Sequence, residues 1–280
     1  MIRGIHVPTY ECLLIDVNTQ RDFCETGGAF PVANVSQLIP QLRRMIAWAL
    51  RNETPVLSSI DAHRPCELPA DRPTCCVDGT DGQRKLDFTL LTSCARVDAD
   101  NTLIVPLEIF EHYQQVIFRK RTDDLLSNPK VERLCTHLNV GEFFVIGNSL
   151  ECSVKSLVLG LLARSKKVSV VLDACGFWNK ASAELAVRQI AAKGADILTV
   201  DAVRSRKLPR KRRYAWARNG WEVADTNGKR GPASDAEPRG RNGNGKKPFD
   251  AARWNARSGV WLPVVPKRGR MRRTDGNGSK

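Results

Sequence analysis

The sequence predicts a three-layer α/β/α domain, with helices on both faces of a mostly parallel sheet, followed by a disordered basic tail. Over residues 1–203, short apolar runs of strand length alternate with segments whose apolar residues recur at helical spacing. After residue 203 the composition changes: this part holds 22 of the 44 Lys and Arg but only 6 of the 30 Asp and Glu. We therefore expect one folded domain over 1–203 and a largely disordered extension over 204–280.

The apolar runs predict the individual elements in chain order. The expected strands are 12–16, 55–60, 102–105, 115–118, 142–146, 168–172 and 197–200. The expected helices are one capped by Ser36, one over 128–138, one over 151–164 and one that ends at Gly194. A long polar connection rich in Pro and Gly follows the second strand, and loops of that length are uncommon unless they build a site.

Charge and cysteine content narrow the class of protein. The first 203 residues carry 22 basic and 24 acidic side chains, which excludes a wholly basic nucleic-acid-binding fold for the domain. No apolar run approaches the ~18 residues of a membrane-spanning helix, and the first ten residues lack an apolar segment of signal-peptide length. The nine cysteines match neither a disulfide framework nor paired zinc motifs. We therefore expect a cytoplasmic protein with reduced thiols.

Four reactive side chains follow the ends of predicted strands: Asp16, Asp61, Lys120 and Cys152. Carboxyl ends of parallel strands meet at one edge of the sheet, where ligands bind. A cysteine in the first turn of a helix is favoured as the thiolate, Asp16 can accept its proton, and Lys120 can stabilise both charges. The backbone N–H groups of Ser149 and Cys152 can form an oxyanion hole. Together these groups predict acyl transfer through a thioester, although each alone also fits a structural role.

Five segments occur in an order found in a known family: LLIDVNTQRDF (13–23), SSIDAH (58–63), CVDGTDGQRKL (76–86), VIFRKR (116–121) and VIGNSLECSV (145–154). Together they resemble the isochorismatase-like cysteine hydrolases, particularly the nicotinamidase branch, over residues 11–203. The resemblance implies a Rossmann-like topology, hydrolysis of a small amide or carbamoyl compound, and a catalytic triad of Asp16, Lys120 and Cys152.

The resemblance also implies a metal site and a substrate pocket. Asp61 and His63 match the Asp-x-His pair of the metal-binding members, and Cys75 stands where a later His is expected. These three residues are the candidate ligands for zinc or another divalent metal, with Cys66 as the alternative to Cys75. Without a metal, Asp61 and His63 would line the pocket as hydrogen-bonding groups. Phe23 matches a pocket aromatic, and Arg72 stands near the place of a second one. A cation there suits an acidic or carbamoyl substrate better than nicotinamide.

The basic extension contains the cationic block 207–213 and four of the six tryptophans. Such segments can bind nucleic acid through phosphate neutralisation and base stacking, or an acidic partner, and a tail without a specific partner is the alternative. The sequence thus predicts a cysteine-dependent hydrolase with a small-molecule amide substrate. A catalytically silent family member and a nucleic-acid-associated protein acting through its tail remain alternatives, and homo-oligomerisation stays open.

Overall fold

The computed structural model describes residues 7–67, 73–98, 104–206, 214 and 216, and the backbone of two strands at 252–255 and 260–263. Seven parallel strands form a sheet in the order β7-β6-β5-β1-β2-β4-β3. Their bounds are β1 (Thr9–Val17), β2 (Val56–Asp61), β3 (Cys94–Val97), β4 (Gln115–Lys120), β5 (Asn139–Gly147), β6 (Val168–Cys175) and β7 (Asp196–Leu198). The predicted fold class is confirmed.

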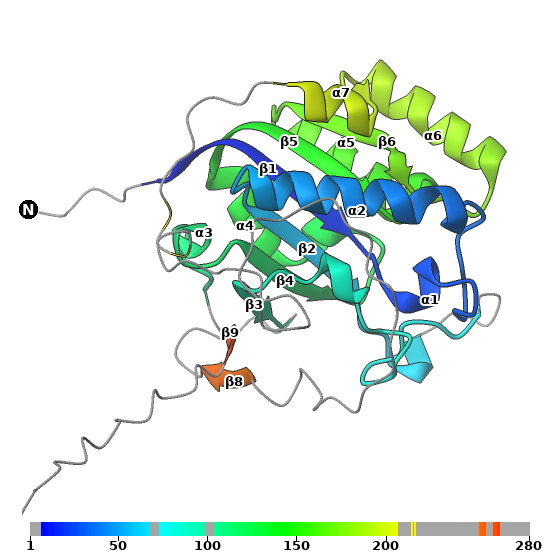
Figure 1. Cartoon of the computed structure of the whole chain (residues 1–280), viewed down its shortest axis with the longest axis horizontal. Coiled ribbons are helices and arrows are strands. Elements are labelled where there is room, and N and C mark those ends of the chain that lie inside the picture. The colour runs from blue at the N-terminus through cyan, green and yellow to red at the C-terminus, as the bar shows by residue number, and fades with distance from the viewer. Residues whose placement is uncertain are drawn as a thin grey trace, which may run out of the picture.

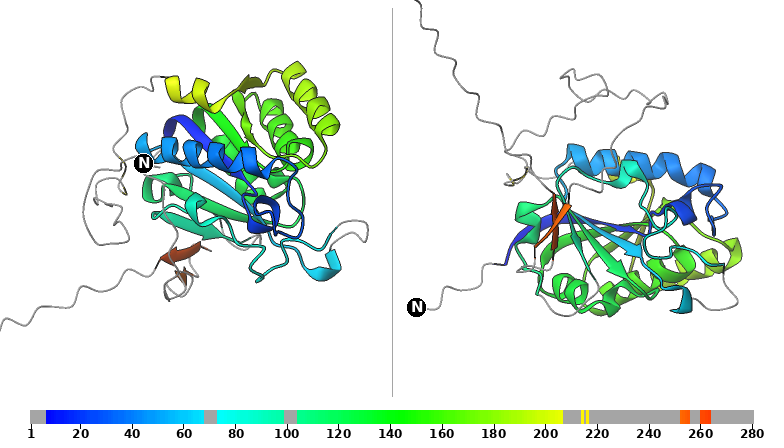
Figure 2. Two further views of the ribbon diagram at one scale, coloured as in Figure 1. Left: turned by 45° about the vertical axis from the view of Figure 1, so that its right-hand side comes forward. Right: turned by 90° about the horizontal axis from the view of Figure 1, so that it is seen from below.

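Helices cover both faces of this sheet, so the domain has three layers (Figures 1 and 2). One face packs against α1 (Arg21–Cys24), α2 (Val35–Arg51) and α7 (Val200–Ser205). The other packs against α3 (Ile109–His112), α4 (Pro129–His137), α5 (Lys155–Ala163) and α6 (Lys180–Ala192). None of the helices in the described part of the chain combines the length and apolar composition needed to cross a bilayer.

The central strand β1 shows why the apolar runs are continuous. Leu13, Ile15 and Val17 are fully buried against the α4 and α5 side, whereas Leu14 is fully buried against the α2 side. Successive side chains of a strand point to opposite faces, and both faces of this sheet are covered. The strand therefore needs apolar residues at nearly every position, and Asp16 is a conspicuous exception.

The strand predicted over 102–105 is wrong at the two positions that the structure describes. Ile104 and Val105 are in no strand, and 102–103 lie outside the described residues. The edge strand is β3 instead, which pairs with β4 from Cys94↔Gln115 to Val97↔Phe118. Pro106, directly after Val105, has no N–H with which to extend a strand ladder.

The folded part continues beyond the boundary predicted at residue 203. Helix α7 runs to Ser205. Trp216 is 6% exposed, its indole Nε1 donates to Phe110 O at 3.0 Å, and its ring stacks on Tyr214 at 4.7 Å. Tyr214 in turn stacks on Tyr10 of β1. Tyr214 and Trp216 of the basic extension therefore belong to the core of the domain.

Two further strands from the extension lengthen the sheet. Strands β8 (Ala252–Asn255) and β9 (Val260–Pro263) pair antiparallel with each other, and β9 pairs antiparallel with β3 (Figure 1). The parallel sheet thus gains an antiparallel edge. The rest of the predicted disordered tail lies outside the described residues.

Candidate active site

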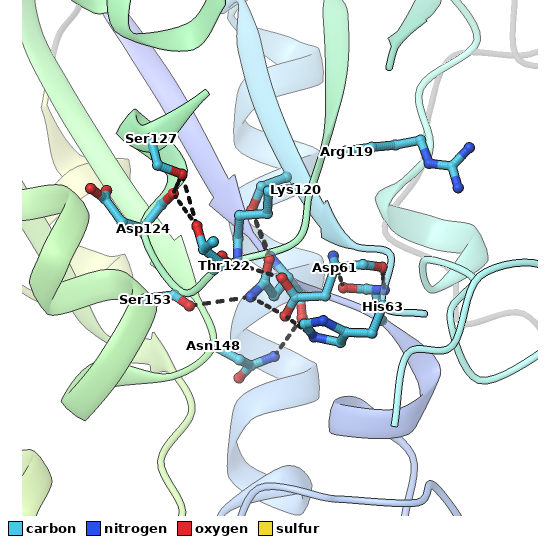
Figure 3. Close-up of polar contacts among 12 residues, drawn as sticks. Asp61, His63, Arg119, Lys120, Thr122, Asp124, Ser127, Asn148 and Ser153 are labelled. Carbon is cyan, nitrogen blue, oxygen red and sulfur yellow. Dashed lines mark hydrogen bonds and ion pairs between the residues drawn. The ribbon is translucent and has the colours of Figure 1, made fainter. Parts of the chain in front are cut away.

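Asp61 and Lys120 form a buried ion pair at the carboxyl ends of β2 and β4 (Figure 3). The parallel register places the two residues opposite each other. The Lys120 ammonium contacts Asp61 Oδ1 and also donates to Thr122 O at 2.9 Å. The Asn18 amide donates to Asp61 Oδ2 at 2.9 Å, so both carboxylate oxygens accept a hydrogen bond. This pairing satisfies two charged groups that the fold removes from water.

Gln20 fixes the backbone of Asp61 from the other side. Its Oε1 accepts from the Asp61 N–H at 2.7 Å, and its Nε2 donates to Asp61 O at 2.9 Å. His63 lies two residues further on, with its Nε2 4.0 Å from Asp61 Oδ2. Figure 3 shows the side chains of Asp61, His63 and Lys120 gathered at one place on the edge of the sheet. A carboxylate, an imidazole and an ammonium therefore converge there.

Asp16 belongs to a different pair. Its Oδ2 accepts from Lys85 Nζ at 2.7 Å and from Ser58 Oγ at 3.1 Å, and Lys85 also donates to Thr19 Oγ1 at 2.6 Å. Asp16 is fully buried, and its Oδ1 has no hydrogen-bond partner. The structure thus pairs Lys120 with Asp61 rather than with Asp16, the partner that the predicted triad requires. The β2–β4 register decides this, and register is a long-range property.

Lys85 had no assigned role in the sequence analysis, although it lies in the segment 76–86 that carries part of the resemblance. The only indication of burial in the sequence is that Lys85 stands at the end of a polar loop, directly before the apolar Leu86. The side chain of Lys85 is 2% exposed. A lysine is almost never buried this far without a charged partner, and the sequence does not show which carboxylate it meets.

Cys152 lies on the loop that joins β5 to α5. It sits inside a single π-helical turn, Leu150–Val154, that continues into α5, and its side chain is partly exposed. Its backbone N–H donates to Ser149 O at 3.2 Å, so this predicted oxyanion donor has a partner in the structure. The peptide bond between Asn148 and Ser149 is cis. We call residues 147–152, which include the candidate nucleophile Cys152, the nucleophile loop.

The nucleophile loop is connected to the Asp61–Lys120 pair through Asn18. The Asn18 amide donates to Ser153 Oγ at 3.4 Å as well as to Asp61, and the Asn148 amide donates to Asn18 O at 3.1 Å. Asn18 was not singled out from the sequence. Its positive φ of 49° marks the bend at which β1 leaves the sheet.

Several polar atoms of the nucleophile loop are buried without a partner. They are Asn148 Oδ1, Ser149 Oγ and Glu151 Oε2. An unsatisfied buried polar atom is costly, and each one calls for an explanation. Three of them lie within four residues, directly before Cys152, and can form hydrogen bonds with water or with a bound ligand.

Phe23, the predicted pocket aromatic, is 3% exposed and belongs to an aromatic cluster. Its ring meets Trp178 edge-on at 5.7 Å, and Trp178 stacks on Phe30 at 4.4 Å. Trp178 follows β6 and its backbone N–H donates to Glu151 Oε1 at 2.8 Å, which ties the cluster to the nucleophile loop. Arg72, the other predicted pocket residue, lies outside the described residues.

The predicted metal ligands do not form a three-ligand group. Both oxygens of Asp61 accept hydrogen bonds, and no cluster of three or more His, Cys, Asp or Glu in the described ranges is placed to hold a metal ion. Cys75, the third predicted ligand, is buried beside Cys76 and shares a hydrogen bond with its thiol. These residues therefore do not fit a metal ion, and Lys120 supplies the positive charge beside Asp61.

A family model for the isochorismatase domain matches residues 12–202. The match covers most of the chain, and the chain belongs to the isochorismatase-like hydrolase family, as its sequence motifs predict. A search of curated proteins gives no significant match.

Solved structures with a similar fold include members of the same family. A pyrazinamidase of Pyrococcus horikoshii in complex with zinc is 21% identical, with a TM-score of 0.55 over 68% of this chain and 99% of that one. An isochorismatase family protein from Desulfovibrio vulgaris is 18% identical, with a TM-score of 0.55 over 70% and 97%. PnC1 from L. infantum in complex with nicotinate is 15% identical, with a TM-score of 0.55 over 70% and 98%. At these identities the likeness establishes the fold.

Proposed function

We propose that this chain is a cysteine-dependent hydrolase that cleaves a small amide or carbamoyl C–N bond through a thioester on Cys152. The observation that carries the proposal is the position of Cys152. It is partly exposed, it follows a loop with buried unpartnered polar atoms, and its neighbour Ser153 is joined through Asn18 to the Asp61–Lys120 pair. A nucleophile with an oriented charged pair beside it is the arrangement that covalent catalysis needs.

The reaction proceeds in two halves. The Cys152 thiolate attacks the carbonyl carbon, and the C–N bond of the tetrahedral intermediate breaks as the nitrogen takes up a proton and leaves as ammonia or an amine. Water then attacks the thioester, releases the acid, and returns a proton to the thiol. Of the two predicted oxyanion donors, the Cys152 N–H already donates to Ser149 O, so we assign the developing oxyanion to the Ser149 N–H.

We assign the proton transfers to Asp61 and the electrostatic support to Lys120. Asp61 contacts Lys120 directly and shares the Asn18 amide with Ser153, the residue that follows Cys152 in the sequence. Asp16, the acceptor predicted from the sequence, is bound to Lys85 and Ser58 and faces the α2 side of the sheet. Replacing each carboxylate in turn decides between the two assignments.

We propose a compact substrate with a flat or carbamoyl group. Trp178, which is partly exposed and packs edge-on against the buried Phe23, supplies an aromatic surface next to the nucleophile loop. A ring or planar amide packs on such a surface. The relatives whose structures are described as a pyrazinamidase and as a nicotinate complex point to the same class.

The test is an ammonia-release screen over small amides and carbamoyl compounds, with and without a chelator. We expect turnover that survives chelation and is lost, by at least about 10³-fold, in Cys152→Ala with an unchanged melting temperature. Cys66→Ala is the matched control, because Cys66 is exposed and removal of its thiol changes the same chemical group elsewhere. Wild-type turnover in Cys152→Ala would refute the mechanism.

One observation favours a second candidate, a family member without turnover: Asp16 and Lys120, two of the three predicted catalytic residues, are paired with other partners. An inert site would leave the Cys152 thiol no more reactive toward iodoacetamide at pH 7 than the exposed Cys66. Alkylation of Cys152 well ahead of Cys66 excludes this candidate.

A further inference from the structure

A cavity of about 540 Å³ opens at the edge of the sheet, and none of Asp61, His63, Lys120 or Cys152 lines it. Strand β7 ends opposite Val171, so β6 continues past its neighbour and leaves a notch beside its last residues. Helices α2 and α6, which pack on opposite faces of the sheet, border this notch. The volume lies in the range of sites for small organic ligands, about 300–1,000 Å³.

The inner walls of the cavity are apolar. Leu172 of β6, Phe177 of the following loop and Val187 of α6 line it, together with Leu150 of the nucleophile loop. Leu172, Phe177 and Val187 are only partly buried by the protein itself. Partly exposed apolar side chains that line a concavity gain free energy when an apolar group covers them.

The mouth of the cavity carries charged groups with a positive excess on α6. Lys180, Glu184 and Arg188 are spaced by four residues, so they lie along one face of the helix. Glu184 is one turn from each cation, and a single carboxylate cannot neutralise two of them. Asp173 of β6 also lines the cavity, where its Oδ1 accepts the Val200 N–H at 2.9 Å, so the positive excess belongs to the α6 side of the mouth and not to the lining as a whole.

We propose that this cavity binds a small amphiphile with an apolar body and one anionic group, such as an aliphatic or aromatic carboxylate. The apolar body covers the walls formed by Leu150, Leu172, Phe177 and Val187. The anionic group faces Lys180 and Arg188 at the mouth. This site goes beyond the proposed hydrolase activity and does not depend on it, because no residue assigned to the reaction lines the cavity.

The segment 176–179, which includes the cavity residue Phe177, also forms hydrogen bonds with the nucleophile loop. The Leu150 N–H donates to Gly176 O at 2.9 Å, and Glu151 Oε1 accepts from the N–H groups of Trp178 and Asn179 at 2.8 and 3.0 Å. A ligand that packs on Phe177 therefore contacts the segment whose N–H groups bind Glu151, the residue before Cys152. Occupancy of the cavity is expected to change the rate at which Cys152 reacts.

Octanoate, octylammonium and octanol test the proposal on the full chain by isothermal titration calorimetry. The three probes share a chain and differ in charge. We expect octanoate to bind more tightly than octanol, and octylammonium to bind most weakly. Arg188→Gln should weaken octanoate about fivefold, the upper end of what an exposed ion pair contributes, and leave octanol unchanged. Lys193→Gln is the matched control: it removes the same charge from the end of the same helix, outside the cavity.

Ala183→Leu provides a second variant, since Ala183 lines the cavity and a larger side chain fills it. We expect it to abolish octanoate binding while the melting temperature stays near that of the wild type; if it unfolds, Arg188→Gln carries the test alone. Equal affinities for the three probes, no binding of octanoate, or equal losses in Arg188→Gln and Lys193→Gln would overturn the site. An alkylation rate of Cys152 that octanoate does not alter would overturn the coupling to the nucleophile loop.

Discussion

The two buried lysine–aspartate pairs of this domain contain the same groups in different surroundings. Asp16 and Lys85 lie on the α2 side of the sheet, where their hydrogen bonds lead to Ser58 and Thr19. Asp61 and Lys120 lie on the opposite side, the face of the sheet that α4 and α5 cover. All four side chains are at most 5% exposed, so burial does not distinguish the two pairs.

What distinguishes them is their connection to the nucleophile. Asp61 shares the Asn18 amide with Ser153, next to Cys152, whereas the bonds of Asp16 end in polar side chains of the interior. A buried ion pair that connects only to the core is a structural feature: apolar replacement of both partners is often tolerated, whereas removal of one partner leaves a buried charge and is strongly destabilising. We infer that the Asp61 pair serves the reaction and that the Asp16 pair serves the fold.

The largest expected difference in activity is between two double variants, each with one of the pairs replaced by apolar side chains of similar size. Lys120→Met/Asp61→Leu should lower ammonia release by at least about 10³-fold, because it removes both the proton acceptor and the electrostatic support. Lys85→Met/Asp16→Leu should leave activity within about tenfold, since apolar replacement of a buried pair is often tolerated. Turnover on the substrate found by the screen, corrected for the folded fraction, measures the contrast. The opposite order would transfer the catalytic role to Asp16.

Breaking the Asp16 pair without replacing its partner should be costly for stability. Asp16→Asn leaves the buried Lys85 ammonium uncompensated, which we expect to lower the free energy of unfolding by about 3–5 kcal/mol. Urea denaturation measures this loss. Asp81→Asn is the control, because Asp81 is exposed and its pairs with Arg21 and Arg84 should be worth less than about 1 kcal/mol. A loss below about 1 kcal/mol in Asp16→Asn would show that the Asp16 pair does not support the fold.

Thiol labelling compares the two sides of the sheet. Cys24 lies near Asp16 and Lys85, and burial raises its pKa to about 12. At pH 8 it is therefore almost wholly the unreactive thiol, and iodoacetamide should modify it at least about tenfold more slowly than Cys152. Peptide mapping by mass spectrometry after limited alkylation gives both rates. The same order is expected for Cys12 and Cys135, whose pKa values burial raises to about 11 and 12; equal rates would mean that these side chains are accessible.

We expect replacement of the basic block 207–213 to leave the reaction unchanged, which makes it the smallest effect among these predictions. Replacing its five Lys and Arg by Gln should leave Cys152 alkylation unchanged. If the block contacts nucleic acid, each lost phosphate contact lowers the slope of log K against log[salt] by about 0.9. A salt series of fluorescence-anisotropy titrations with duplex DNA and single-stranded RNA measures that slope, and an unchanged affinity and slope would exclude the block as a nucleic-acid contact.

Most of the fold could be predicted from the sequence because strands buried on both faces need continuous apolar runs. The expected segments 12–16, 115–118 and 168–172 each fall inside an observed strand. The errors have local causes: Val105 precedes a proline, and the helix expected from 151 begins as a π-helical turn at Leu150. The strands β8 and β9 could not be predicted, since their short segments depend on the exposed edge of β3 for pairing.

The pairing of the buried charges could not be predicted from the sequence, and the roles of the candidate site residues stay predictions. Asp16, Asp61, Lys120 and Cys152 could be selected from local pattern alone, because each follows the end of a predicted strand. Which lysine meets which aspartate depends on strand register and on the path of a long polar loop that brings Lys85 to Asp16, and both are set by contacts distant in sequence. The link through Asn18 was missed for the same reason, because an asparagine at a strand end reads locally as a turn residue.

The most direct test of the central claim is the rate of Cys152 alkylation by iodoacetamide at pH 7 in three proteins: wild type, Lys120→Met and Lys85→Met. We predict that Cys152 in the wild type reacts faster than the exposed Cys66 and slows at least about tenfold in Lys120→Met, because the positive charge that favours the thiolate is lost. In Lys85→Met the rate should stay within about twofold. Equal slowing in both variants, or a wild-type Cys152 no faster than Cys66, would contradict the account.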